Sequence, residues 1–240
     1  MPGLGTIINC GGVIGGGLLG LLMKKGLSSR FQDILIQAVG LCVLFLGISG
    51  AMQQILFVEQ GQLQTRGTMM MIFSLGFGAL LGEFLKIEQH TEAFGVWVKQ
   101  KSGSGNDASF VDGFVNTSLT ICIGAMAVVG SIQDGISGNI SMLTAKAVLD
   151  AIIVFVMASS LGKGCIFSVI PLGLFQGSMT LLSRLIEPLL TEQAIANLSL
   201  VGSMLIFCVG INLMFQQKLK VANMLPALIF AVAAAFLPWF

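Results

Sequence analysis

The sequence predicts an all-α fold, a polytopic transmembrane helix bundle that forms one integral membrane domain over residues 1–240. Only 10% of the residues are charged and 55% are hydrophobic, whereas a soluble domain carries about 25% charged residues. The mean hydropathy is +0.94. The 31 glycines are typical of membrane helices, in which small residues let backbones approach closely.

Apolar runs long enough to cross a bilayer recur along the chain. A spanning helix needs about 20 mostly apolar residues, and polar breaks separate eight such runs. The sequence therefore predicts eight spans, at residues 4–23, 34–52, 68–85, 113–130, 142–161, 165–182, 198–215 and 222–239.

The basic residues predict the orientation of these spans. Most of the lysines and arginines fall in the odd-numbered loops, beginning with Lys24 and Lys25 after the first run. Cytoplasmic loops carry the excess of positive charge, so both termini are expected to be external. No basic leader precedes the first run, which is therefore expected to be a retained span and not a signal peptide.

One long cytoplasmic connection is expected at residues 86–112. The apolar residues Phe84, Ile87, Phe94 and Val98 recur at helical spacing with Trp97 beside them, which predicts an amphipathic helix on the membrane surface. The serines and glycines at 102–107 then predict a flexible linker.

The glycines of the first span form a regular stripe. Gly12, Gly16 and Gly20 are four residues apart and share one helix face, which predicts close helix packing. Gly15–Gly20 also matches the dinucleotide pattern, but that site needs a strand before its glycines. The stripe can pack within one chain or between two, and it is the basis for expecting a homodimer.

Spans one and three are similar to each other. Gly5-Thr6 aligns with Gly67-Thr68, and the same alignment matches the pairs Gly16 and Gly78, Gly20 and Gly82, and Lys24 and Lys86. A shorter motif, glycine followed by isoleucine or alanine, recurs at 47–48, 124–125 and 210–211. Two interpretations stay open: an internal repeat, inverted where the spans run in opposite directions as in many transporters, or the general resemblance of glycine-rich spans.

Lys146 and Asp150 form the most informative pair of charges. They lie four residues apart and so share one face of span five, with Asp150 about 12 Å from the span's edge. A carboxylate at that depth is expected to face the bundle interior or a water-filled cavity. A functional site and a structural ion pair both fit this pattern.

Other polar residues extend the candidate pathway. The stretch 130–139 contains glycines with Gln133 and Asp134, which predicts an irregular segment that either re-enters the membrane or forms an exposed turn. Amides within the spans complete the set at Asn9, Gln176 and Asn212. Each amide is also explained by hydrogen bonding between helices.

These features predict a secondary transporter or channel for a small polar solute or ion. The alternative is a membrane scaffold or sensor without flux. No combination of nucleophile and base appears in the sequence, so we do not expect an enzyme, and no cofactor, metal site or nucleic-acid partner is predicted. The expected partners are the lipid bilayer, the solute and a second copy of the chain.

Several motifs carry a family resemblance over the whole chain. The most specific is the block Gly124–Gly135, with looser matches at 5–9, 146–150, 175–177, 210–212 and 223–227. On these motifs the sequence resembles the bacterial YqgA/YdfK family of inner-membrane proteins of unknown function. The resemblance implies a multi-pass protein of the bacterial inner (cytoplasmic) membrane, and it supplies no substrate.

Overall fold

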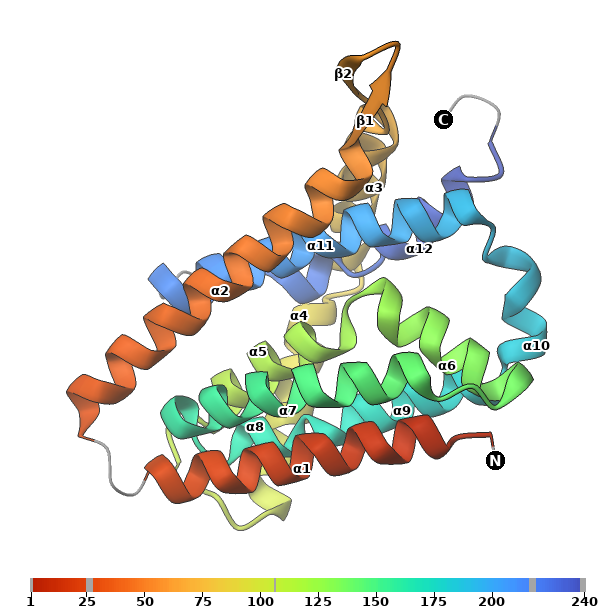
Figure 1. The fold of residues 1–240 in the computed structure, drawn as a ribbon. Coiled ribbons are helices and arrows are strands. Elements are labelled where there is room, and N and C mark those ends of the chain that lie inside the picture. The colour runs from red at the N-terminus through yellow and green to blue at the C-terminus, as the bar shows by residue number, and fades with distance from the viewer. Residues whose placement is uncertain (1, 25–27, 106, 216–218, 238–240) are drawn as a thin grey trace.

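The structure is a computed structural model that describes residues 2–24, 28–105, 107–215 and 219–237. Helices α1 and α5–α9 pack together on one side, and α2, α3, α11 and α12 pack on the other (Figure 1). The elements in chain order are α1 (Leu4–Lys24), α2 (Ser29–Ile55), β1 (Leu56–Glu59), β2 (Gln62–Thr65), α3 (Thr68–Phe84), α4 (Ile87–Lys101), α5 (Phe110–Cys122), α6 (Ala125–Ser137), α7 (Ser141–Leu161), α8 (Gly164–Phe167), α9 (Val169–Leu181), α10 (Ser183–Ile186), the 3-10 helix η1 (Glu187–Leu189), α11 (Glu192–Phe215), the 3-10 helix η2 (Val221–Met224) and α12 (Ala227–Ala234).

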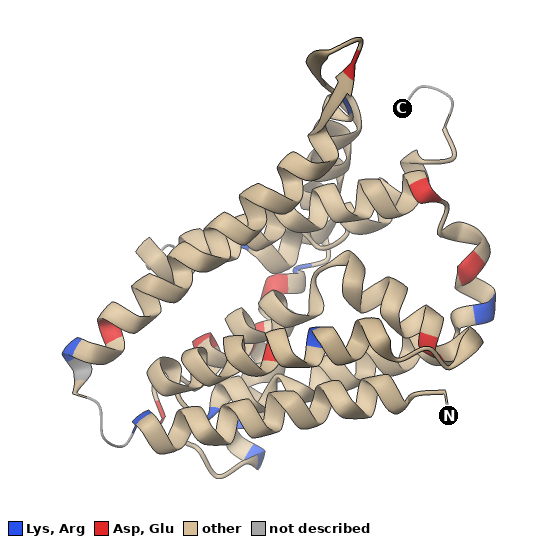
Figure 2. Cartoon of the chain, viewed as in Figure 1, with Lys and Arg blue, Asp and Glu red and all other residues tan. Residues whose placement is uncertain are grey.

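The predicted membrane bundle is confirmed, but the predicted number of eight spans is wrong. Within the described residues, five helical segments are long and apolar enough to cross a membrane: α1, α2, α7, α8 with α9, and α11. The number rises to seven if two bent pairs each form one span, α3 with α4 at 56° and α5 with α6 at 63°. Charged positions are sparse along the long helices (Figure 2).

A backbone break explains the difference at the predicted fourth span. The range 113–130 is interrupted at Ile123-Gly124, where α5 ends and α6 begins. Gly124 has φ +144, a conformation that residues with a Cβ rarely adopt. Helix α6 then continues to Ser137, so the irregular backbone predicted for 130–139 is wrong over most of its length. Gly138, with φ +69, caps the helix.

The predicted eighth span is also too long. Helix α12 has eight residues and is therefore about 12 Å long, well short of the hydrocarbon thickness. Pro226 stands immediately before it, and the 3-10 turns of η2 precede that proline. Residues 238 and 239 lie outside the described part of the chain.

Residues 56–65, in the loop between the predicted second and third spans, form a β-hairpin. Strands β1 and β2 pair antiparallel, with Glu59 opposite Gln62. The two turn residues, Gln60 and Gly61, have φ +51 and +77, as a type I′ turn requires.

The packing role predicted for the glycine stripe is confirmed. A Cβ added to the three glycines of the stripe would lie 2.2 to 2.8 Å from a backbone oxygen of α7, so the two backbones are almost in contact. The contacts pair Gly12 with Ala147, Gly16 with Ala151 and Gly20 with Phe155. Because α7 covers this face, the stripe is not free to join a second chain, and the homodimer stays a prediction.

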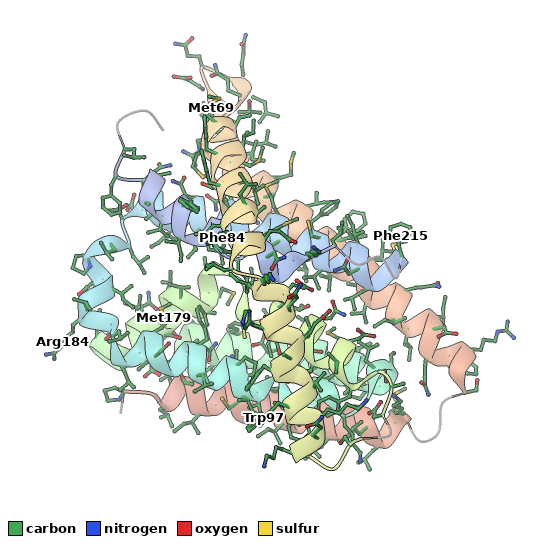
Figure 3. The ribbon with its side chains drawn as sticks, turned by 180° about the vertical axis from the view of Figure 1, so that it is seen from behind. Met69, Phe84, Trp97, Met179, Arg184 and Phe215 are labelled. Carbon is green, nitrogen blue, oxygen red and sulfur yellow. The ribbon has the colours of Figure 1, made fainter. Side chains whose placement is uncertain are left out.

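The outer surface of the bundle is apolar. Large side chains such as Ile7, Phe45 and Leu80 are more than 60% exposed, as expected of a surface that faces lipid. Figure 3 shows the face formed by α3 and α4, where Phe84 and Trp97 are 82% and 53% exposed.

Helix α4 forms where the sequence predicts an amphipathic helix. Its Val98 is buried, and Phe94 meets Phe114 of α5 edge-on with ring centroids 5.8 Å apart. The helix therefore packs against α5 and not only against a membrane surface. Ser104, in the predicted flexible linker, is buried, and position 106 of that linker lies outside the described residues.

Candidate functional site

A buried ion pair on α7 is the centre of the candidate site. The Lys146 Nζ donates to both carboxylate oxygens of Asp150 and lies 2.7 Å from Oδ1. The two residues are only 6% and 3% exposed. The predicted sharing of one helix face is therefore confirmed, and both charges point into the bundle.

The broken helix α5 supplies a third contact to this pair. Lys146 Nζ also donates to the backbone oxygen of Ile121 at 2.7 Å. Ile121 lies in the last turn of α5, two residues before the break at Ile123-Gly124. The last carbonyls of a helix have no partner within it and carry partial negative charge, so this helix end is a favourable place for an ammonium group.

Two amides from other helices join the pair. The Asn9 side chain on α1 donates through Nδ2 to Asp150 Oδ2 at 2.9 Å and to Gln176 Oε1 on α9 at 3.3 Å. Both amide residues are fully buried. Four of the residues predicted from sequence therefore meet in one cluster, built from α1, α7 and α9.

The amides have unused hydrogen-bonding capacity. Asp150 accepts from Asn9, which fixes the amide nitrogen toward the carboxylate. Asn9 Oδ1 and Gln176 Nε2 are then buried without a hydrogen-bond partner among the described residues. Such groups are rare in folded proteins, and the cluster therefore has a free acceptor and a free donor for another polar group.

Asp134 lies at the end of the bundle where α1 begins. It is fully buried in the last turn of α6, and its Oδ2 accepts a hydrogen bond from the Gly5 amide at 3.0 Å. That contact satisfies one of the free N–H groups at the start of α1. Asp134 Oδ1 and the adjacent Thr6 Oγ1 are both buried without a partner in the described chain.

The structure does not bring Gln133 and Asn212 into this cluster. Asn212 holds the chain after α11, donating to the Leu219 oxygen and accepting from the Leu219 amide, both at 2.9 Å. Gln133 is half-buried, and no hydrogen bond joins its side chain to the Lys146–Asp150 cluster within the described residues.

A separate acidic cavity opens near the end of α1. It has a volume of about 510 Å³ and lies between α1, α2, α4, α5, α7 and α11. Four carboxylates line it with one lysine, from Asp33, Glu88, Glu92, Asp112 and Lys24. Asn212 lines this cavity, whereas none of the described residues of the buried cluster does.

Two contributors to the site were not predicted from the sequence. The Ile121 carbonyl is a backbone group, and only the break at Gly124 makes it available. Thr6 lies three residues before Asn9 on the same buried face of α1, so that spacing was the signal that could have identified it.

Comparisons with known proteins support the resemblance seen in the sequence. Residues 4–236 match the family described as "Protein of unknown function (DUF554)". The chain is 29% identical over 232 residues to the "Uncharacterized membrane protein YdfK" of Bacillus subtilis (strain 168), covering 97% of this chain and 95% of that protein. It is 29% identical over 244 residues to the "Uncharacterized protein YqgA" of Escherichia coli (strain K12), covering 99% of each. No solved structure matches the chain.

Proposed function

We propose that this chain, which belongs to the family described as Protein of unknown function (DUF554), is a secondary transporter or channel for a small polar solute or ion. The observation that carries the proposal is the meeting of a broken helix with a buried polar cluster. The end of α5 faces Lys146, and the cluster keeps an unpaired acceptor and donor on Asn9 and Gln176. Discontinuous helices that present their ends to a buried site are typical of secondary transporters.

Two glycine contacts support the inverted repeat that such transporters commonly contain. Helices α2 and α11 are antiparallel, and Gly47 packs on Phe207 while Gly210 packs on Leu44. Each glycine contacts the residue three positions before the other glycine, so the two contacts exchange under a twofold rotation. The 47–48 and 210–211 motifs are therefore the strongest candidates for equivalent positions in an inverted repeat.

The same contacts also support the alternative hypothesis, a membrane scaffold or sensor without flux. Lys146 and Asp150 are mutually paired, and the described acidic cavity does not reach them. A static ion pair that orients α7 accounts for both facts. The two hypotheses predict different effects on flux and folding when the charge of Asp150 is removed.

Asp150→Asn is expected to abolish flux while leaving the protein folded and inserted. Asparagine keeps the size of the side chain, and its oxygen can still accept from Asn9 and Lys146. Lys146 also keeps the Ile121 carbonyl as a partner, so folding is retained, but the charge that binds or couples the solute is lost. The measurement is flux in proteoliposomes under imposed proton, alkali-ion and small-solute gradients, with thermal unfolding in detergent measured on the same preparations.

The control is Asp112→Asn, which removes a carboxylate from the acidic cavity and leaves the buried cluster intact. It is expected to keep measurable flux. Full flux through well-folded Asp150→Asn would contradict the proposed mechanism. If that variant fails to fold and the double change Lys146→Met with Asp150→Leu restores normal behaviour, the scaffold hypothesis is favoured.

The proposed orientation places the N-terminus and the hairpin outside and the connection after α4 in the cytoplasm. On a background in which the five cysteines are replaced, Gln62→Cys in the hairpin is expected to react with an impermeant maleimide added to intact cells. Gly105→Cys, which is exposed with open space around it, is expected to react only after permeabilisation. Labelling of Gly105→Cys in intact cells would contradict the assignment.

A further inference from the structure

Unpaired buried oxygens are concentrated where α1 begins and α6 ends. Among the described residues, five buried side-chain atoms lack a hydrogen-bond partner, and three of them are Thr6 Oγ1, Asn9 Oδ1 and Asp134 Oδ1. These residues are 8%, 0% and 0% exposed. Buried polar atoms are almost always paired, so three unpaired oxygens at one place require an explanation that the ion pair on α7 does not give.

The three oxygens belong to one small region. Asp134 Oδ2 lies 3.0 Å from the Gly5 amide, which places the carboxyl group beside Thr6. Thr6 and Asn9 both lie on the buried face of α1, three residues apart, a spacing that brings Cβ atoms to about 5–6 Å. The carboxylate and the hydroxyl therefore adjoin the first turn of α1, and the amide carbonyl lies one turn further along the same buried face.

The chemistry of this set favours a hard cation. All three unpaired atoms are oxygens, which are the ligands that hard cations prefer. Asp134 forms no salt bridge within the described residues, where the ion pairs are Lys146–Asp150 and Lys220–Glu83. The positive end of α1 and the negative end of α6 both adjoin Asp134, so the effects of the two helix dipoles on its carboxylate oppose each other. The negative charge of the carboxylate therefore still needs a positive partner.

The charge of the set indicates a monovalent ion. One carboxylate with two neutral oxygens balances a single positive charge, whereas the calcium sites of EF-hand loops use several carboxylates. The described residues contain no group of three or more His, Cys, Asp or Glu side chains placed to hold a metal ion.

We propose that a small monovalent cation of the sodium or lithium class binds between Thr6 Oγ1, Asn9 Oδ1 and Asp134 Oδ1. Asn9 links this site to the ion pair, because its oxygen faces the cation while its nitrogen donates to Asp150. A cation on the amide oxygen polarises the amide and strengthens that hydrogen bond. The assignment names the ion of the proposed transporter and rests on the proposed function for the ion's role in flux, although not for binding itself.

The test is a salt titration of the purified protein in detergent, at fixed pH and at ionic strength held constant with choline chloride. Sodium chloride and lithium chloride are expected to raise the unfolding temperature of the wild type in a saturable way. Thr6→Val and Asp134→Asn keep the side-chain shape and are expected to raise the half-saturating concentration roughly tenfold or more, the change that follows when a ligand worth about 1.4 kcal/mol is lost.

Two variants serve as matched controls. Thr117→Val removes a fully buried hydroxyl on α5, and Asp112→Asn removes a carboxylate from the acidic cavity. Both are expected to keep the response to sodium at its wild-type concentration. Loss of the response in these controls together with the site variants would overturn the assignment, because the effect would then not depend on the site.

Measurements on the wild type alone can also overturn the assignment of the cation site. If sodium, lithium and potassium chlorides all act as choline chloride does, the three oxygens bind no alkali ion, whatever the variants do. Flux in proteoliposomes that does not depend on alkali ions would reject the cation's role in flux and leave the proposed function standing. Saturable stabilisation by sodium without flux of any tested solute would retain the site and reject transport.

Discussion

Gly16→Ala is expected to destabilise the bundle strongly, because the added methyl group has no space. Its Cβ would lie 2.2 Å from the backbone oxygen of Ala151, and a backbone atom on a packed helix cannot move aside as a side chain can. Overpacking of a core typically costs about 1–3 kcal/mol, and we expect the upper end of this range here. Thermal unfolding in detergent and the yield of monodisperse protein measure the effect.

Gly15→Ala is the matched control on the neighbouring position. A Cβ there meets no atom within 4 Å, and alanine is a better helix former than glycine by about 1 kcal/mol. Its stability is expected to equal or slightly exceed that of the wild type. Equal stability of the Gly16 and Gly15 variants would show that α1 and α7 are not in backbone contact.

Lys146→Met is the second change for which we expect a large effect. It removes the cation that pairs with Asp150 and leaves a carboxylate that is only 3% exposed with the Asn9 amide as its remaining partner. Removing one member of a buried ion pair typically costs about 3–5 kcal/mol. The variant is expected to unfold at a much lower temperature than the wild type, or to be recovered in low yield.

The double variant Lys146→Met with Asp150→Leu is expected to regain most of that stability. Replacing a whole buried ion pair by apolar side chains of similar volume is often neutral or stabilising, and the backbone oxygen of Ile121 loses only one hydrogen bond. A double variant no more stable than Lys146→Met would mean that the pair is not the source of the instability.

The sequence was sufficient where a pattern repeats along one helix. The spacing of Gly12, Gly16 and Gly20 predicted a face for close packing, and α7 occupies that face. Lys146 and Asp150 were placed together because residues four apart on a helix are neighbours. In each case the local geometry of a helix carries the information, and no knowledge of the rest of the fold is needed.

The sequence was insufficient where a single backbone conformation interrupts an apolar run. The sequence is apolar on both sides of Ile123-Gly124, so hydropathy did not predict the break between α5 and α6. This break leaves the Ile121 carbonyl free to accept a hydrogen bond from Lys146. The hairpin was missed because the two strands that Gln60 and Gly61 connect have only four residues each. Strands of this length are too short to show a clear alternating pattern. The meeting of Asn9 with Gln176 depends on tertiary packing, and sequence spacing cannot predict it.

The direction of packing between α1 and α7 limits how often the chain crosses the bilayer. Their contacts advance together, from Gly12 with Ala147 to Gly20 with Phe155, so both helices run the same way and start on the same side. An odd number of crossings must therefore separate them. Since α2 is one crossing, the two bent pairs either both cross or both turn back, which leaves seven or five spans and excludes six. Opposite accessibility of Gln62→Cys and Gly105→Cys would select seven.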